Sequence, residues 1–268
     1  MNGWLVYSQE ESVRNEWFAG RLIESASEYR LQLDLMIEEE MAELPVLPDF
    51  VIYRGRDHSF SRRLEEAGVR LFNRSEVTRI ANDKLQTAQL AMLLGIPVVP
   101  TRELQRPAEI RTFPAVVKTV SGHGGKDVFL CETMADVEQL LAERPDDLWI
   151  FQPFIEHGAS DVRVYMLGEE CTGAVRRTGA DSFKSNVALG GHAERFSPPA
   201  PLLAFAEKIV KAVKSDYIGI DFIQNEEGVW LLNEIEDPVG ARSLYETSDC
   251  DAARELMRYI DRKLKKPF

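Results

Sequence analysis

Short apolar runs alternate with amphipathic segments over the first 80 residues. Four runs have the length of strands: residues 3–7, 31–37, 49–53 and 69–72. Two segments between them have helical spacing: residues 12–29, with Trp17, Leu22 and Ile23 among the apolar positions, and residues 58–67. Strand–helix–strand order is typical of a parallel sheet. Residues 1–80 therefore predict a small α/β domain, and the glycine-free turn 8–12 excludes a dinucleotide fingerprint there.

The remainder of the chain predicts helices mixed with antiparallel strand pairs. Helices are expected at about 82–94, 133–143, 200–214 and 249–265. Strands are expected at 114–119, 127–131, 149–152, 161–167, 171–177, 217–223 and 231–238. The short turns between several of these strands indicate hairpins, which distinguishes this part of the chain from the parallel N-terminal region.

The last predicted hairpin carries three carboxylates, Asp221, Glu234 and Glu236. If its turn centres on Glu226 and Glu227, Asp221 lies opposite Leu232, and alternation places all three acids on one face. Like charges about 4 Å apart repel by roughly 4 kcal/mol at a surface-like dielectric, so such a patch needs cations or protonation. Mg²⁺ prefers oxygen ligands and phosphate partners, so a divalent ion is the hypothesis that this pattern favours.

Composition argues against membrane-spanning, disulfide-stabilised and nucleic-acid-binding proteins. The 268 residues are 44% hydrophobic and contain no apolar run of about 18 residues, so no membrane span is expected, and the N-terminus lacks the pattern of a leader. Cys131, Cys171 and Cys250 lie far apart, which favours a reducing, cytoplasmic compartment. The net charge of −12 argues against a nucleic-acid partner.

A glycine-rich loop, residues 121–126, separates two predicted strands and is a candidate phosphate cradle. It is not a Walker A loop, because Val120 and Asp127 stand where that motif needs Gly and Ser or Thr. An ordinary turn is the alternative, with His123 at its tip. Lys118, just before the loop, either points into a cleft or snorkels to solvent, and Lys84 by itself is compatible with an ordinary first-turn helix residue.

Taken in order, these pieces resemble an ATP-grasp enzyme, and the RimK-like branch in particular. The resemblance covers roughly residues 80–262. It is carried by Asn82-Asp83-Lys84-Leu85, Leu94-Gly95-Ile96-Pro97-Val98, Val116-Val117-Lys118 with the glycine-rich loop, Phe151-Gln152-Pro153-Phe154-Ile155, Asp161-Val162-Arg163, Arg176-Arg177, Ser185-Asn186, Gly190-Gly191, Gly219-Ile220-Asp221 and Glu234-Ile235-Glu236.

The resemblance implies a role for each matching residue. Lys84 and Lys118 would hold ATP phosphates under the loop formed by Gly122, His123, Gly124, Gly125 and Lys126. Gln152, Pro153, Phe154 and Ile155 would form the adenine linker, with Asp161 on the ribose side. Arg163, Arg176 and Asn186 would face the reacting carboxyl and the γ-phosphate, with Arg177 and Lys184 as neighbours. Asp221, Glu234 and Glu236 would ligate two Mg²⁺ or Mn²⁺ ions.

Two positions depart from the family pattern. Pro153 stands where an acidic residue is usual in the linker, and proline offers no N–H, so that contact must come from elsewhere. Glu236 stands where the family commonly has Asn in its final metal motif. A carboxylate still supplies oxygen to Mg²⁺ or Mn²⁺, so we interpret Glu236 as a variant ligand.

The resemblance also implies an architecture and an activity. The fold would be α/β, with a pre-ATP-grasp domain at 1–80 and a two-lobed α+β grasp at 81–268, its lid lobe at about 112–155 and its catalytic lobe at about 156–268. The activity would be ATP-dependent ligation of a small-molecule or peptide carboxylate to an amine through an acylphosphate. An ATP-grasp kinase acting on a hydroxyl and a nucleotide-binding regulator without turnover are the alternatives. The sequence does not identify either substrate.

Overall fold

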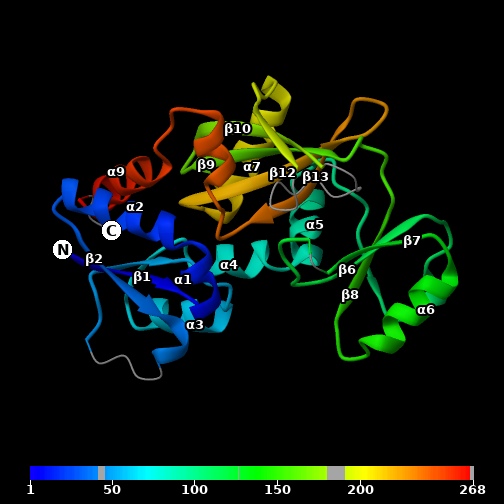
Figure 1. The fold of residues 1–268 in the computed structure, drawn as a ribbon, viewed down its shortest axis with the longest axis horizontal. Coiled ribbons are helices and arrows are strands. Elements are labelled where there is room, and N and C mark those ends of the chain that lie inside the picture. Colours follow the sequence, from blue (N-terminus) through cyan, green and yellow to red (C-terminus); the bar gives the residue numbers. More distant parts are fainter. Residues whose placement is uncertain (42–45, 126, 180–190, 266–268) are drawn as a thin grey trace.

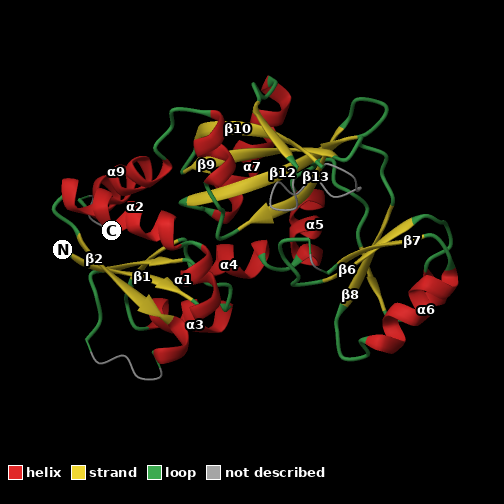
Figure 2. Cartoon of the chain, in the orientation of Figure 1, coloured by secondary structure: helices red, strands yellow, loops and turns green. Residues whose placement is uncertain are grey.

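The computed structural model describes residues 1–41, 46–125, 127–179 and 191–265. This part of the chain forms three sheets, and along the long axis the last of them in chain order lies between the other two (Figures 1 and 2). The first sheet is parallel and has the strand order β2-β1-β3-β4. Its strands are β1 (Asn2–Tyr7), β2 (Gln32–Ile37), β3 (Phe50–Tyr53) and β4 (Arg70–Phe72). The predicted parallel α/β arrangement of the N-terminal region is confirmed.

Helices cover both faces of this first sheet. The predicted helix 12–29 is two helices, α1 (Gln9–Arg14) and α2 (Glu16–Glu28), because Asn15 leaves helical geometry between them. Phe18 and Leu22 of α2 pack on one face of the sheet, and α3 (His58–Glu66) packs Phe60 on the other. Trp17 is 59% exposed, so it is not part of the buried face of α2.

The second sheet forms the lid lobe, at the right of Figure 1. It is antiparallel with the order β5-β8-β6-β7, and α6 (Met134–Glu143) packs on it. Its strands are β5 (Arg102–Leu104), β6 (Ala115–Thr119), β7 (Val128–Cys131) and β8 (Trp149–Pro153). The lobe has its own core, which includes Val117, Val137 and Trp149. It begins earlier than the predicted residue 112, because the short strand β5 pairs with β8.

The third sheet forms the C-terminal lobe and is antiparallel, in the order β11-β10-β9-β12-β13. Its strands are β9 (Ser160–Leu167), β10 (Glu170–Thr178), β11 (His192–Arg195), β12 (Tyr217–Gln224) and β13 (Trp230–Glu236). One face, with Val162 and Val164, packs under α7 (Ala200–Val213). The opposite face, with Tyr165, packs towards α8 (Arg242–Thr247) and α9 (Ala252–Leu264).

The N-terminal domain and the C-terminal lobe share one apolar core. Phe18 and Leu22 of α2 belong to the same buried cluster as Tyr165 of β9 and Leu256 of α9. Helices α2 and α9 lie side by side in Figure 1 and are in contact. Two helices lie between the N-terminal domain and the lid lobe along the chain: α4 (Ser75–Ala81), which the sequence did not predict, and α5 (Lys84–Leu93), close to its predicted place. No described helix is both long and apolar enough to cross a membrane.

The carboxylate hairpin forms, but in a different register from the predicted one. Asp221 pairs with Glu234 instead of Leu232, and the pairing shifts by one residue between Asp221 and Phe222. Phe222 pairs with Leu232, so Asn233 is the additional residue of a β-bulge. Without this bulge Asp221 would pair with Asn233, and Glu234 would point to the opposite face. The bulge therefore places the three acids on one face of the sheet, as predicted, although in a register that the sequence did not predict.

Candidate active site

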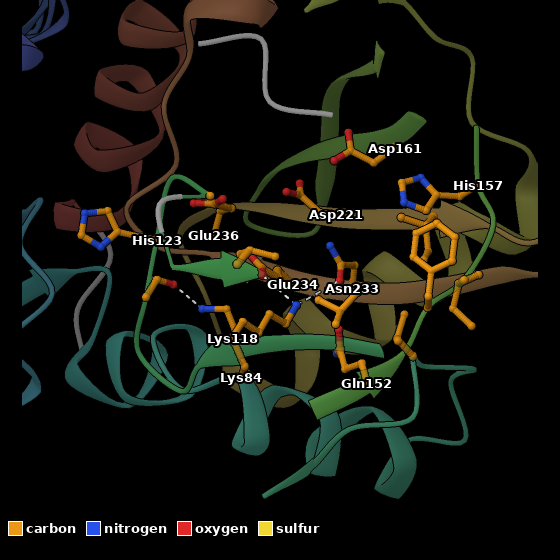
Figure 3. A pocket seen from close by; sticks show the side chains of 18 of the residues that line it. Lys84, Lys118, His123, Gln152, His157, Asp161, Asp221, Asn233, Glu234 and Glu236 are labelled. Atoms are coloured by element: carbon orange, nitrogen blue, oxygen red, sulfur yellow. Dashed lines mark hydrogen bonds and ion pairs between the residues drawn. The ribbon is translucent and has the colours of Figure 1, made fainter. Parts of the chain in front are cut away.

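A cavity of about 120 Å³ lies between the lid lobe and the C-terminal lobe (Figure 3). It collects residues from segments that are far apart in sequence, including all fourteen predicted nucleotide- and metal-binding residues. These are Lys84, Lys118, Gly122, His123, Gly124, Gly125, Gln152, Pro153, Phe154, Ile155, Asp161, Asp221, Glu234 and Glu236. The predicted residue Asn186, together with Lys126, Lys184, Ser185 and Gly190, lies outside the described residues.

Two lysines reach the cavity from opposite lobes. Lys84 opens α5, directly after the N-cap Asp83, and its Nζ donates a hydrogen bond to the backbone oxygen of Gly122 in the glycine-rich loop. Lys118, on β6, is 3% exposed, and its Nζ lies 3.2 Å from Glu234 Oε1 and 3.5 Å from Asn233 Oδ1. Burial lowers the pKa of Lys118, and the Glu234 carboxylate opposes that effect. Lys118 thus points into the cleft and is not a snorkelling residue.

The bulge in β13 explains how two consecutive residues both reach Lys118. In a regular strand Asn233 and Glu234 would point to opposite faces. Because the bulge interrupts the alternation, both side chains contact Lys118, while Leu232 and Ile235 are both buried in the core under α7. Asn233 is a site residue that the sequence did not single out, and its position as the extra residue of a bulge could be recognised only from the strand register.

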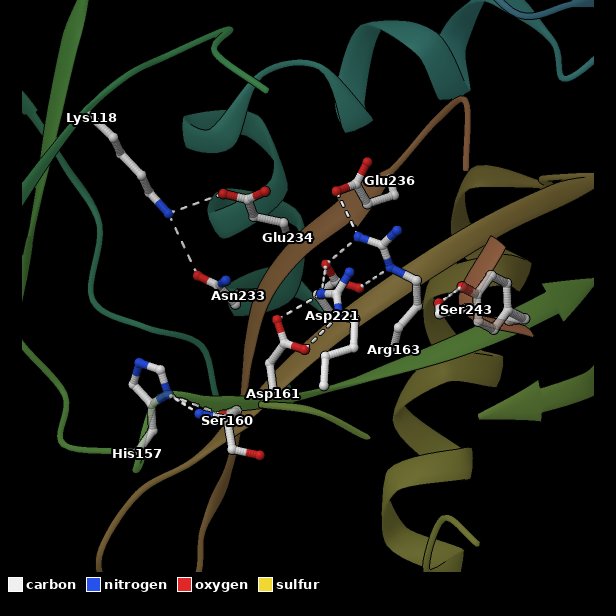
Figure 4. Close-up of polar contacts among 12 residues, drawn as sticks. Lys118, His157, Ser160, Asp161, Arg163, Asp221, Asn233, Glu234, Glu236 and Ser243 are labelled. Atoms are coloured by element: carbon white, nitrogen blue, oxygen red, sulfur yellow. Dashed lines mark hydrogen bonds and ion pairs between the residues drawn. The ribbon is translucent and has the colours of Figure 1, made fainter. Parts of the chain in front are cut away.

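The other acids are neutralised by two buried arginines. Arg163 donates two parallel hydrogen bonds of 2.7 Å to Asp221 and one of 2.7 Å to Glu236. Arg177 bridges Asp161, at 2.7 and 2.6 Å, and Asp221, at 2.7 Å. The result is a chain of alternating charges, Asp161–Arg177–Asp221–Arg163–Glu236, of which Figure 4 labels Asp161, Asp221, Arg163 and Glu236. In this structure protein cations compensate the repulsion that the sequence predicts.

The pKa values reflect this arrangement. Burial raises the pKa of Asp221, but the charges of Arg163 and Arg177 outweigh burial and lower the pKa to about 2. The pKa of Glu234 is also lowered, because Lys118 and Lys84 overcome the effect of burial. Asp221 and Glu234 are therefore anionic at neutral pH, as ligands of a hard divalent cation must be.

The donor chemistry of the three acids suits Mg²⁺ or Mn²⁺, but their present geometry is not that of a preformed site. Within residues 1–41, 46–125, 127–179 and 191–265, no three Asp, Glu, His or Cys side chains converge closely enough to hold a metal ion. Both oxygens of Asp221 accept hydrogen bonds from arginines, whereas Glu234 and Glu236 each keep 24% of their side-chain surface exposed. The metal role of these residues stays a prediction.

Of the three arginines named from the sequence, Arg163 and Arg177 lie beside the acids and Arg176 does not. Arg176 was expected to face the reacting groups, but its guanidinium lies over the ring of Phe196, 4.8 Å from the centroid, outside the cavity. Arg177 pairs across the strands with Asp161, so its side chain lies on the site face of the sheet. Neighbouring strand residues point to opposite faces, and only the register with β9 decides between them.

The remaining predicted residues occupy the two ends of the cavity. His123 lies at the loop end, where its Nε2 is 3.9 Å from Glu11 Oε1 of α1. Gln152 lies at the linker end, and its Nε2 donates a 2.7 Å hydrogen bond to Thr101. Asp161, expected on the ribose side, lines the cavity, but its carboxylate is bound by Arg177. The roles assigned to these three residues stay predictions.

Comparison with known proteins gives one family and several relatives. A model of the RimK-like ATP-grasp domain matches residues 81–260. An uncharacterised protein of Mycoplasma pneumoniae is 29% identical over 90% of this chain and 85% of its own length. The glutamate–LysW ligase ArgX of Sulfurisphaera tokodaii is 26% identical over 76% of this chain and 77% of its own.

Solved structures agree on the fold. D-cycloserine synthetase DcsG superimposes with a TM-score of 0.81 at 17% identity, covering 99% of this chain and 100% of that one. The ATP-grasp ligase PsnB, in a complex with a precursor peptide variant, Mg and ADP, gives a TM-score of 0.73 at 16% identity, covering 98% of both chains. The predicted fold class, an α/β protein with a grasp of two antiparallel sheets, is confirmed.

Proposed function

The chain belongs to the RimK-like ATP-grasp family, and from this premise we propose that it is an ADP-forming carboxylate–amine ligase. ATP and Mg²⁺, or Mn²⁺, are the proposed cofactors. The substrates are a small-molecule or peptide carboxylate and an amine, joined as an amide. One observation carries the proposal: two lysines, a glycine-rich loop, a linker strand and three carboxylates line a single cavity between two lobes.

The residues of this cavity suit a nucleotide triphosphate. Lys84 and Lys118 would donate hydrogen bonds to phosphate oxygens from opposite lobes, a task for which a compact ammonium is suited. Backbone N–H groups of Gly124 and Gly125 would approach the phosphates, since both residues have positive φ values that favour glycine. Gln152 to Ile155 would accommodate the adenine ring.

The proposed chemistry requires no nucleophile from the protein. A carboxylate oxygen of the substrate attacks the γ-phosphorus and ADP leaves, and the amine nitrogen then attacks the acyl carbon and phosphate leaves. Asp221, Glu234 and Glu236 would hold the metal, whose chemistry is neutralisation of phosphate charge. Arg163 and Arg177, next to these acids, would orient the substrate carboxylate and stabilise the developing negative charge.

An ADP-release screen over amino acids and short peptides, with Mg²⁺ or Mn²⁺, tests the proposal. The product mass then identifies the reaction. A mass equal to acid plus amine minus water supports a ligase, whereas a phosphorylated acceptor would indicate a kinase. ATP binding without ADP release for any acceptor would contradict the ligase proposal and favour a nucleotide-binding regulator.

The names of the relatives suggest where the screen should begin. ArgX is named as a ligase of glutamate and LysW, and PsnB is described with a precursor peptide. Free glutamate, paired in turn with amines and with peptide carboxylates, is therefore the first combination to test. Neither substrate class is assigned to this chain by the similarity alone.

A further inference from the structure

A second, larger cavity of about 540 Å³ adjoins the first. It lies between the N-terminal domain and the segment that follows β13, and no residue of the adenine linker reaches it. His123, Gly124, Arg177 and Glu236 line both cavities, so the two are continuous at the end where the charged chain lies. A molecule in the second cavity would therefore touch the end of the first that the phosphates of ATP are proposed to occupy.

The second cavity is basic, although the whole chain carries a net charge of −12. Six arginines and three glutamates line it: Arg14, Arg54, Arg56, Arg163, Arg177 and Arg242, with Glu11, Glu236 and Glu246. Arg14 and Arg56 pair with Glu11, and Arg163 and Arg177 pair with the acids of the charged chain. Arg54 and Arg242 form no ion pair with any residue that the structure describes. A concentration of cations in an acidic protein favours an anionic ligand.

Arg54 is the more informative of these two. It is 4% exposed, directly follows β3, and its guanidinium lies near the rings of Tyr7 and Phe18, 5.8 and 5.4 Å from their centroids. Its Nε donates to the Tyr7 hydroxyl at 3.3 Å and its Nη2 to the backbone oxygen of Val239 at 2.7 Å. Its Nη1 donates to no described atom.

These contacts position the guanidinium without neutralising it. A hydroxyl, a carbonyl and two aromatic faces supply partial charges, and Asp237 acts on Arg54 only at longer range. Burying a cation without a paired anion is unfavourable, and an anionic ligand would complete the pair. The buried, fixed guanidinium of Arg54 thus has the properties of a preformed anion receptor.

The position of Arg54 in the sheet leads to the same conclusion. In the order β2-β1-β3-β4, β1 and β3 are neighbours at the centre of the sheet. The chain runs from β1 to β2 on one side of this pair and from β3 to β4 on the other side. Tyr7 ends β1 and Arg54 follows the end of β3, so both lie at the carboxyl edge where the direction changes. Open parallel sheets bind ligands in the crevice at this place.

We propose that the second cavity binds the non-nucleotide substrate and that this substrate is a small molecule with two acidic groups. Arg54 binds the acidic group that does not react, and the reacting end lies near Arg163 and Glu236. A cavity of about 540 Å³ has room for an amino acid or a dipeptide. The inference rests on the proposed ligase function, because that function requires a substrate beside the phosphates.

Binding of matched acids and amides tests this inference without turnover. The probes are L-glutamate against L-glutamine and L-aspartate against L-asparagine, measured by calorimetry, both without nucleotide and with a non-hydrolysable ATP analogue and Mg²⁺. We expect at least one acid to bind about 10- to 100-fold more tightly than its amide, the range for one charge-assisted hydrogen-bonding group. Equal binding of acid and amide, or no binding of either acid, would overturn the inference.

Substitution of Arg54 identifies the receptor. Arg54→Met removes the charge at similar length and should abolish the preference for the acid while binding of the ATP analogue is unchanged. Arg54→Lys should keep part of the preference. Arg62→Met, at an exposed arginine of α3 paired with Glu66, is the matched control and should behave as wild type. A folded Arg54→Met protein that keeps the full preference would overturn the assignment of Arg54.

A second variant covers the case in which Arg54→Met does not fold. Arg242 is exposed at the start of α8, so Arg242→Gln should fold and bind the acid more weakly than wild type. Unchanged acid binding in Arg242→Gln would contradict binding of the acid in this cavity, where Arg242 is the other arginine without an ion pair among the described residues. Failure of the proposed ligase function and failure of this inference can be told apart. Acid-selective binding without ADP release refutes only the ligase function, and ADP release without acid preference refutes only the inference about the second cavity.

Discussion

The lid lobe and the rest of the molecule are held in place by different kinds of interaction. The N-terminal domain and the C-terminal lobe, here called the joined body, share an apolar core in which Leu22 of α2 and Leu256 of α9 belong to one cluster. The lid lobe keeps a separate core around Val137. It approaches the body through polar contacts at the first cavity, such as Lys118 with Glu234.

This difference shows which part of the molecule can move when a ligand binds. Apolar packing in the joined body would have to be broken for its halves to separate, at a cost proportional to the area exposed. The contact between Lys118 and Glu234 is ionic. A phosphate can therefore replace Glu234 as the partner of Lys118, and a metal ion can replace Lys118 as the partner of Glu234, at little cost in free energy. We therefore expect nucleotide binding to reposition the lid lobe and leave the joined body unchanged.

The sharpest test compares one core substitution in each region. Leu22→Ala, at a fully buried position in the shared core, should lower the free energy of unfolding of the whole joined body by about 2–5 kcal/mol. Leu140→Ala, in the lid core, should instead accelerate hydrogen exchange within residues 102–153 and leave β1 and β12 protected. Denaturant unfolding and hydrogen exchange measure the two effects. Equal acceleration in both regions by Leu140→Ala would refute separate cores.

The next largest effect should come from the carboxylates between the regions. Glu234→Ala and Glu236→Ala should each reduce ADP release by about 100- to 1,000-fold, with little change in melting temperature, if both hold the metal. Only Glu234 contacts the lid lobe, whereas Glu236 contacts Arg163 of the body. Loss of activity in the Glu234 variant alone would therefore assign lid docking instead of metal binding, and full activity in both would refute the metal assignment.

Lys118→Met isolates the contribution of the lid to nucleotide binding. A phosphate contact from this ammonium should account for about 10- to 100-fold in ATP affinity, measured by calorimetry. The stability of the free protein should change little, because the lost pair with Glu234 is offset by relief from burying a cation. Lys211→Met, at a surface lysine near Glu207, is the matched control and should bind ATP as wild type does.

Much of this comparison could be predicted from the sequence. Apolar positions with a period of two predicted strands, and those with a period near four predicted helices, because burial on one face imposes that period. These patterns predicted the parallel N-terminal sheet and most later strands and helices. Lys84, Lys118 and the three acids could be placed in one site because their motifs occur in a family order. Short elements such as β5 and α4 carry too few periodic positions to be recognised.

The features that could not be predicted depend on strand register. A bulge at Asn233 places it and Glu234 on the same face, and its presence follows from the packing of Leu232 and Ile235 in one core. Likewise, a shift of one residue in β10 would exchange the roles of Arg176 and Arg177. The N-terminal domain and the C-terminal lobe share a core because segments far apart in the sequence pack together. A predicted boundary at residue 80 contains no information about that packing.

The smallest predicted effect concerns the polar part of the joined body. Asp216, just before β12, accepts hydrogen bonds on Oδ1 from Arg70 of β4 at 3.2 Å and from the Tyr259 hydroxyl of α9 at 2.9 Å. Burial raises the pKa of Asp216 above its ordinary value, and Arg70 and Tyr259 oppose this shift only in part. The folded protein therefore binds this proton more tightly than the unfolded chain does.

The sign of the pH dependence follows from that difference. As pH rises from the unfolded pKa of Asp216 through the raised folded pKa, the stabilisation by the bound proton is lost. Asp216→Asn keeps the Oδ1 acceptor but does not titrate, so the stability of wild type relative to this variant should fall with rising pH across that interval and then level off. Urea unfolding at a series of pH values measures it. A relative stability that instead increases with pH would mean that pairing with Arg70 outweighs the burial of Asp216. Charge attraction between the two side chains would then stabilise the contact between the N-terminal domain and the C-terminal lobe by more than the desolvation of Asp216 costs.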